Sequence, residues 1–202
     1  MIRIIFLTIF LCMNFFQVIS HAASQYNEYT VTDPYTYRNL AIFLIRGRNT
    51  IKADRFITLD EAIRQKKIIV YETEEVNELS VRNLSKKDTI FIQSGDIVKG
   101  GKQDRVIRFD IIIPPRSGRI PIDSFCVEQG RWEKRGNEEA DHFSSADEKL
   151  SSKKLKIAAK SSGSQSEVWD QVGAFQEKLE RKTGKPVKNG ESESSLQLTL
   201  EN

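Results

Sequence analysis

The sequence has few of the residues on which many active sites depend. Its 202 residues include only two cysteines, Cys12 and Cys126, and two histidines, His21 and His142. A zinc site made of cysteine and histidine commonly uses four ligands of these types. Cys12 and His21 lie near the amino terminus, and the rest of the chain has only one cysteine and one histidine, too few for such a cluster. A Ser-His-Asp or Cys-His site would have to use His142, which lies in the loop-like stretch NEEADHFSSADEK. A site of carboxylates alone remains open.

A large excess of charge of one sign is also lacking. Lysine and arginine number 31 against 28 aspartates and glutamates, a net charge of +3. Binding of nucleic acid through bulk positive charge needs a clear basic excess, so we expect no nucleic-acid partner. The length fits one domain, with or without a tail.

The amino terminus has the plan of a secretory signal peptide. Arg3 precedes the apolar run IIFLTIFLCMNFFQVI, and small residues, Ser20 and Ala22, follow it. This order of charge, apolar core and small residues is typical of a cleaved leader. We therefore predict that residues 1–23 are removed and that the protein is exported to the periplasm or the exterior.

Two alternatives to cleavage are weaker. An uncleaved anchor would need roughly 20 apolar residues, and this run is shorter and contains Asn14 and Gln17. Lipid modification of Cys12 is disfavoured by the bulky residue before it. Cleavage would leave Cys126 as the only cysteine, so we expect no internal disulfide and no membrane span in the mature protein.

The rest of the chain alternates short β-type segments with turn signals. Runs rich in β-branched and aromatic residues predict strands. Thr58 and Glu61 have the spacing of a capping box at the start of a short helix. The stretch SQSEVWDQVGAFQEKLERKTG predicts an amphipathic helix that ends at Gly184. The predicted strands cover residues 40–47, 67–74, 78–85, 88–94, 105–113 and 119–132.

These elements predict an α+β fold. We expect mainly an antiparallel β-sheet or sandwich, with one short helix and one late amphipathic helix. The expected organisation is an arm (24–39), a β-rich core (40–132), a polar loop (133–166), and a helix with a C-terminal segment of the same domain (167–202).

The stretch GDIVKGGKQDR, residues 95–105, raises the question of phosphate binding. Gly95 and Gly100 have the spacing of a Walker loop, but Gly101 stands where that loop needs lysine, and a strand follows instead of a helix. Consecutive glycines can still form a nest of backbone N–H groups for an anion. The alternative is a charged turn between two strands.

A second polar stretch, FCVEQGRW, ends the last predicted strand of the core. A lone cysteine such as Cys126 on an alternating strand is usually a small buried apolar group. Glu128 and Arg131 would form an ion pair in the simpler interpretation, or share a polar pocket with the glycine stretch. Trp132 would be a wall of that pocket or part of the core.

The two stretches GDIVKGGKQDR and IPIDSFCVEQGRW resemble one family, the ARG and rhodanese-phosphatase-superfamily-associated protein domain. FITLDEAI, SEVWDQV and SLQLTLEN are similar to further segments of that family, so the resemblance covers roughly residues 38–202. Asp96 and Asp104 stand where members often have glutamate and asparagine. The matching motif positions are Gly95, Gly100, Lys102, Gln103, Arg105, Cys126, Glu128, Gly130, Arg131 and Trp132.

The family name implies association with ADP-ribosylglycohydrolases and phosphatases, and hence a link to NAD-derived or ADP-ribosyl metabolites. It implies no reaction, so we assign no catalytic residue, cofactor or metal ligand. Similar proteins continue past the SLQLTLEN segment, so this chain resembles a shortened member.

We expect an exported ligand-binding module for a small phosphate-bearing or nucleotide ligand. One alternative is an enzyme acting on an ADP-ribosyl or phosphoryl substrate with Glu128 as general base. The other is a structural interaction module of the cell envelope, in which the two motifs form a buried salt-bridge network. The expected ligand-binding residues are Lys102, Gln103, Arg105, Glu128, Arg131 and Trp132.

Overall fold

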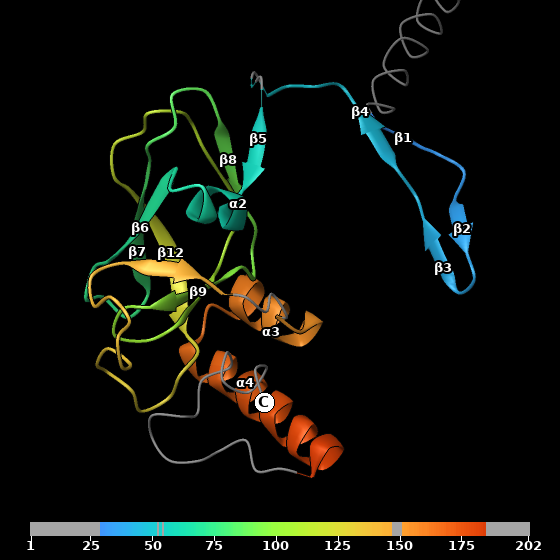
Figure 1. Ribbon diagram of the computed structural model, residues 1–202. Coiled ribbons are helices and arrows are strands. Elements are labelled where there is room, and N and C mark those ends of the chain that lie inside the picture. The colour runs from blue at the N-terminus through green and yellow to red at the C-terminus, as the bar shows by residue number, and fades with distance from the viewer. Residues whose placement is uncertain (1–28, 52, 54, 147–150, 185–202) are drawn as a thin grey trace, which may run out of the picture. The chain divides into compact units, whose positions relative to one another are not determined.

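A computed structural model describes residues 29–51, 53, 55–146 and 151–184 (Figure 1). The predicted signal peptide and the SLQLTLEN segment lie outside the described residues. The chain divides into two compact units, residues 1–52 and 53–202.

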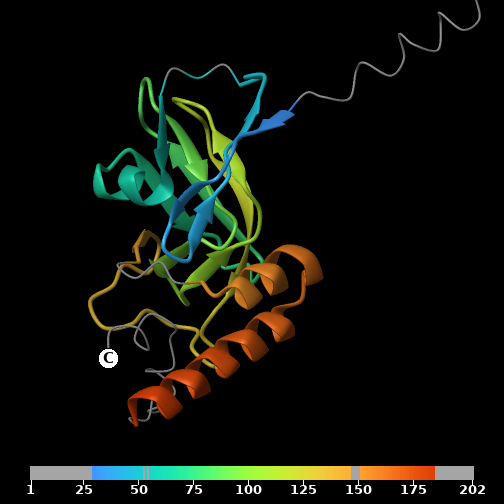
Figure 2. The same ribbon diagram turned by 90° about the vertical axis from the view of Figure 1, so that its right-hand side faces the viewer.

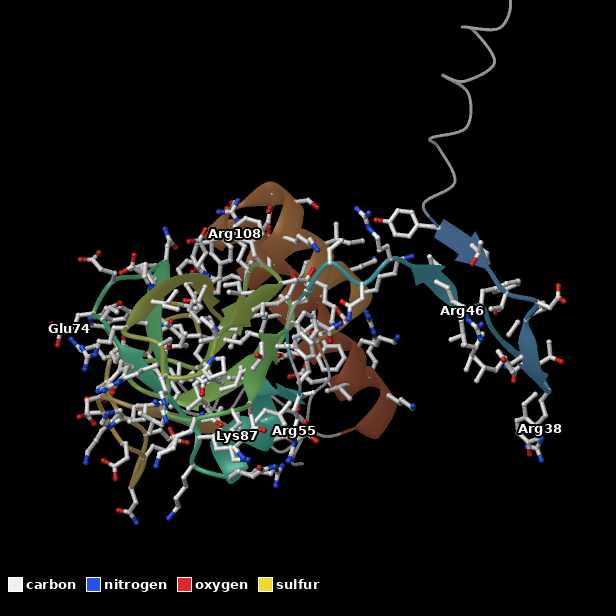
Figure 3. All side chains as sticks on the ribbon, turned by 90° about the horizontal axis from the view of Figure 1, so that it is seen from above. Arg38, Arg46, Arg55, Glu74, Lys87 and Arg108 are labelled. Atoms are coloured by element: carbon white, nitrogen blue, oxygen red, sulfur yellow. The ribbon has the colours of Figure 1, made fainter. Side chains whose placement is uncertain are left out.

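In the first unit, the described residues 29–47 form a two-stranded antiparallel ribbon. Strand β1 (Tyr29–Val31) pairs with β4 (Ile45–Gly47), and β2 (Tyr35–Tyr37) pairs with β3 (Leu40–Ile42). Every residue of these four strands is exposed. Arg38, at a positive φ of 52°, turns the chain at the tip, where Figure 3 shows its side chain. We call residues 29–47 the ribbon.

The second unit is a β-rich core, and we use this name for the described residues from 53 to 184. It opens with β5 (Phe56–Thr58) and helix α2 (Leu59–Arg64). The predicted capping box is present: the Thr58 side chain accepts from the Glu61 amide, and the Glu61 carboxylate accepts from the Thr58 amide at 2.7 Å.

The further strands of the core are β6 (Ile68–Glu72), β7 (Glu78–Asn83), β8 (Thr89–Ile92), β9 (Ile97–Gly100), β10 (Arg105–Ile107), β11 (Ile111–Ile113), β12 (Ile120–Cys126) and β13 (Phe143–Ser145). Two sheets form the body of the core, and among the described strands all pairs in these sheets are antiparallel except β5 with β8. A bridge between Tyr71 and His142 brings the edges of the larger sheet together, so this sheet is nearly closed. The larger sheet has the order β13-β9-β10-β12-β7-β6 and the smaller β11-β8-β5. The predicted α+β class with mainly antiparallel sheet is confirmed.

Two predicted strands, residues 40–47 and 105–113, are wrong as single elements. The first is divided into β3 and β4 of the ribbon, and the two halves of the second belong to different sheets. The chain leaves the larger sheet after β10 and enters the smaller one at β11. Side chains stabilise this bend: the Asp110 carboxylate accepts from the Ser94 amide at 2.8 Å, and the Ser94 hydroxyl donates to the Arg108 carbonyl at 2.7 Å. Regular alternation continues through the bend, so periodicity did not reveal the change of sheet.

The region expected to be a polar loop, residues 133–166, contains regular structure. Besides β13 it includes α3 (Lys153–Ile157) and the π-helix η1 (Ala158–Ser162). Ser152 caps α3 by accepting from the Leu155 amide. Short apolar stretches such as Leu155 and Ala158–Ala159 are buried here, and they were too brief to stand out from the surrounding lysines and serines.

The late helix α4 (Gln165–Thr183) runs as predicted, from the cap Ser164 to Gly184 in the left-handed conformation. Figure 2 shows α3 and α4 together at one end of the β-structure of the core. Val168 and Val172 pack in a cluster with Phe125 and Val127. A second cluster fills the interior between the two sheets, with Leu79, Ile90, Ile107 and other fully buried residues.

One side chain of α4 also makes hydrogen bonds to the end of β12. The Gln165 amide accepts from the Cys126 N–H at 2.9 Å and donates to the Cys126 carbonyl at 2.6 Å. These two bonds imitate the pairing of a neighbouring strand. The first turn of α4 is therefore held directly beside the segment that carries the CVEQGRW motif.

Candidate functional site

Residues 101–104 of the glycine stretch form the turn between β9 and β10, and several backbone N–H groups at this turn already have partners within the protein. The Gly100 amide donates to Asp104 at 3.0 Å, and the Asp104 amide donates to Glu128 at 2.8 Å. The Lys102 amide donates to the Glu72 carboxylate at 3.1 Å. Three carboxylates of the chain thus take the places that an external anion would occupy in a nest.

Gly101 allows this arrangement. It has a positive φ of 56°, and a Cβ atom at this position would lie 2.7 Å from the Glu72 carboxylate and closer still to the Phe143 ring. Glycine is therefore required both by the conformation and by the close approach of Glu72.

Glu72 connects the turn to Arg105. The Arg105 guanidinium lies 3.1 Å from the Glu72 carboxylate, and both side chains are at most 3% exposed. Arg105 also donates to the carbonyls of Glu75, at 3.2 Å, and of Val76. Burial of a paired arginine with carbonyl acceptors satisfies most of its donors, although its Nε remains without a partner.

A second buried network joins the two motifs. Glu128 accepts from the Arg131 Nε at 2.8 Å and from the Arg135 Nη1 at 2.9 Å. Asp104 lies 3.4 Å from Arg131 and 3.3 Å from Arg135. Arg135 further pairs with Glu138 at 2.8 Å. We call Asp104, Glu128, Arg131 and Arg135 the ion network.

Within the ion network, neither oxygen of the Glu128 carboxylate is available to act as a base. One of its carboxylate oxygens accepts from the Asp104 amide and from Arg131, and the other accepts from Arg135. The side chain is 1% exposed. A general base needs access to the proton that it removes, and this geometry does not provide it.

Burial raises the pKa of two further titratable groups of these motifs, Asp104 and Cys126. Desolvation, together with the nearby negative charge of Glu128, raises the pKa of Asp104 to about 7, although Arg135 and Arg131 act in the other direction. Desolvation also raises the pKa of the Cys126 thiol to about 11. A thiol of this kind is not an activated nucleophile, in agreement with a small buried apolar role.

The accessible part of the predicted site is its rim. Trp132 is 43% exposed, and its ring lies 5.5 Å from the Lys102 Nζ and 5.7 Å from the Arg105 guanidinium carbon. Lys102 pairs at 3.1 Å with Glu74, a residue on the outside of the core (Figure 3). We call Lys102 and Trp132 the rim pair.

The six predicted ligand-binding residues are thus brought together, but in two layers. Lys102 and Trp132 are accessible, while Gln103, Arg105, Glu128 and Arg131 are at most 5% exposed. Gln103 donates to the Arg131 carbonyl and so connects the two motifs. The assignment of all six as ligand contacts stays a prediction, and the structure limits direct contact to the rim pair in this conformation.

Three members of the site were not evident from the sequence: Glu72, Asp104 as a network residue, and Arg135. Asp104 lies inside the quoted glycine stretch, so its position was visible but its burial was not. Glu72 ends a strand about 30 residues earlier, and Arg135 lies in the segment expected to be a loop. Only the three-dimensional structure, in which the turn after β9 approaches both Glu72 and Arg135, reveals their proximity.

The comparison with known protein families decides the classification. The family model of the ARG and Rhodanese-Phosphatase-superfamily-associated Protein domain matches residues 28–202. The chain belongs to this family. The resemblance predicted from the two motifs is confirmed, and the matched range includes the ribbon as well as the core of this family member.

No curated protein and no solved structure showed significant similarity to the chain. Within the part of the chain that the structure describes, helices are too short or too polar to cross a bilayer. In the same part, no cluster of three or more histidine, cysteine, aspartate or glutamate side chains has an arrangement suited to a metal ion.

Proposed function

We propose that this family member is a binding module for a nucleotide-like ligand, and that the rim pair makes the contact. The observation that carries the proposal is an exposed tryptophan ring with two cationic groups within 6 Å of its centre. Stacking of a base on an aromatic ring contributes roughly 1–3 kcal/mol. Lys102 would donate to the phosphate of the same ligand.

The present partner of Lys102 can be displaced. Glu74 has a side chain that is 74% exposed, and an exposed ion pair of this kind contributes at most about 1 kcal/mol. A phosphate group carries more charge and more acceptor atoms than one carboxylate. Exchange of Glu74 for a ligand phosphate therefore requires no opening of the core.

The buried residues would support this site without touching the ligand. Arg105 lies beneath the Trp132 ring with its charge paired to Glu72. Gln103 and Arg131 hold the turn and the CVEQGRW segment together. We further propose export of the protein and a ligand of the NAD-derived or ADP-ribosyl class, on the basis of the leader-like amino terminus and the family's association.

A second candidate, a structural interaction module, is favoured by one observation. The ion network is buried and internally paired, as expected if the two motifs serve only to stabilise the fold. The enzyme hypothesis has no such support, because both oxygens of Glu128 are engaged.

Fluorescence can test the binding proposal, because the chain contains two tryptophans. In a Trp169→Phe protein, Trp132 is the only reporter, and we expect saturable quenching on titration with ADP-ribose, NAD or AMP. Lys102→Met should weaken binding about tenfold, the effect of losing one charge-assisted contact.

Lys86→Met is the matched control, since Lys86 is an exposed lysine in the segment that follows β7 and is not part of the rim pair. Its affinity should equal that of the parent protein. Absence of quenching by all three nucleotides in a folded protein would contradict the binding proposal and favour the structural module.

A further inference from the structure

A cleft lies between the CVEQGRW segment and α4, and neither member of the rim pair is among its described lining residues. It has a volume of about 640 Å³, within the range of roughly 300–1,000 Å³ typical of ligand sites. One wall includes Gln129 and Gly130, and the other is a face of α4 with Trp169, Asp170, Gly173 and Glu177. We call this hollow the α4 cleft.

Gly173 is a glycine that the fold itself does not need. It lies in the middle of α4, where glycine costs about 1 kcal/mol relative to alanine. A Cβ atom added here would meet no heavy atom within 4 Å, so no neighbour in the protein requires its absence. Glycine in such a place is explained by the close approach of a ligand or another backbone.

The charges of the α4 cleft have one sign. Asp170 and Glu177 are the charged residues among the described lining residues, and lysine and arginine are lacking there. Neither carboxylate has an ion-pair partner in the described part of the chain. Seven residues of helix separate them, a distance of about 10 Å along the axis. The cleft therefore favours a ligand with two positive charges at this separation.

Trp169 adds an apolar surface and an unsatisfied donor. Its ring lines the cleft, and its buried Nε1–H has no hydrogen-bond acceptor. Buried donors without an acceptor are uncommon in native proteins. A carbonyl oxygen brought to the edge of this ring, with a small adjustment of the side chain, would supply the missing acceptor.

We infer that the α4 cleft binds an extended, basic peptide segment of another protein. In the extended polyproline II conformation, residues three positions apart lie on the same side of the chain and about 9 Å apart, so lysines or arginines at this spacing match Asp170 and Glu177. The peptide backbone would pass over Gly173 and present a carbonyl to Trp169. This site is separate from the rim pair and does not depend on the nucleotide proposal.

The test uses the full chain with Trp132→Phe, in which Trp169 is the only tryptophan and reports the cleft. The probe is an acetylated and amidated alanine peptide that contains two lysines three positions apart. We expect a saturable change in fluorescence that weakens as salt rises. Neutralising both carboxylates with Asp170→Asn and Glu177→Gln should weaken binding roughly tenfold, whereas the surface control Glu139→Gln should not.

Gly173→Ala separates a binding role from a structural one. We expect its melting temperature to rise by about 2–4 °C, because alanine favours the helix, while the affinity for the lysine peptide falls more than threefold. An unchanged affinity would overturn the inference that a backbone passes over Gly173. Equal binding of the matching two-glutamate peptide, or of spermidine, would overturn recognition of a basic peptide.

Discussion

The ribbon and the core contain similar strand-forming residues but bury very different fractions of them. The ribbon exposes nine large apolar side chains, including Tyr37 at 68% and Ile45 at 72%. In the core, Leu79, Ile90 and Ile107 are fully buried. Because an isolated two-stranded ribbon is only marginally stable in water, strand propensity alone does not account for the stability of this protein. The burial of apolar side chains between the two sheets of the core accounts for it.

The largest expected effect comes from the ion network of the core. Arg131→Ala would leave Glu128 and Asp104 buried with one positive charge fewer. Breaking a buried pair in this way costs about 3–5 kcal/mol, measured as the free energy of unfolding in urea. The exposed arginine Arg82 on β7 offers a matched control, since Arg82→Ala should change this free energy by less than about 0.5 kcal/mol.

If Arg131→Ala unfolded no more easily than Arg82→Ala, the network would not stabilise the core. The difference between the core and the ribbon would then rest on apolar burial alone.

A smaller effect should appear as a dependence of stability on pH. The pKa of Asp104 is raised in the folded state to about 7, so between its ordinary pKa of 3.8 and 7 the folded protein binds more protons than the unfolded chain. This contribution to stability is complete below pH 3.8 and is lost as pH rises through 7. We expect the free energy of unfolding to fall by at least about 1 kcal/mol between pH 5 and pH 8.

The variant Asp104→Asn should abolish that slope, because asparagine does not titrate. Glu133→Gln, which changes an exposed carboxylate, should retain it. Urea unfolding curves recorded at pH 5, 6.5 and 8 would measure the dependence of the free energy of unfolding on pH in both variants. If the dependence persisted in Asp104→Asn, another titratable group would be its cause.

The smallest effect is expected in the ribbon. Ile42→Ser should alter the free energy of unfolding of the core by less than about 0.5 kcal/mol, since Ile42 is exposed. Ile92→Val removes only one methyl group from a fully buried side chain, yet it should cost about 0.5–1.5 kcal/mol. Circular dichroism during urea unfolding compares the two. A larger loss in Ile42→Ser would show that the ribbon packs against another surface in solution.

Sequence alone predicted the elements whose causes are local. The capping box at Thr58, the late helix with Gly184 at its end, and the mainly antiparallel sheet depend on patterns within a few residues. The bend at Arg108–Asp110 and the burial of Leu155 depend on partners distant in sequence. For the same reason, the six predicted site residues lie together, but their division into a buried layer and an exposed rim could not be foreseen.

The pair of hydrogen bonds between Gln165 and Cys126 has a mechanical consequence. It anchors one end of α4 to the strand that leads into the CVEQGRW segment, so the two walls of the α4 cleft share a fixed point. Any widening of the cleft must pivot about that point and be greatest toward the Thr183 end of the helix. The side chain of Gln165 therefore fixes this end of α4, and Gln165→Ala would remove both hydrogen bonds to Cys126.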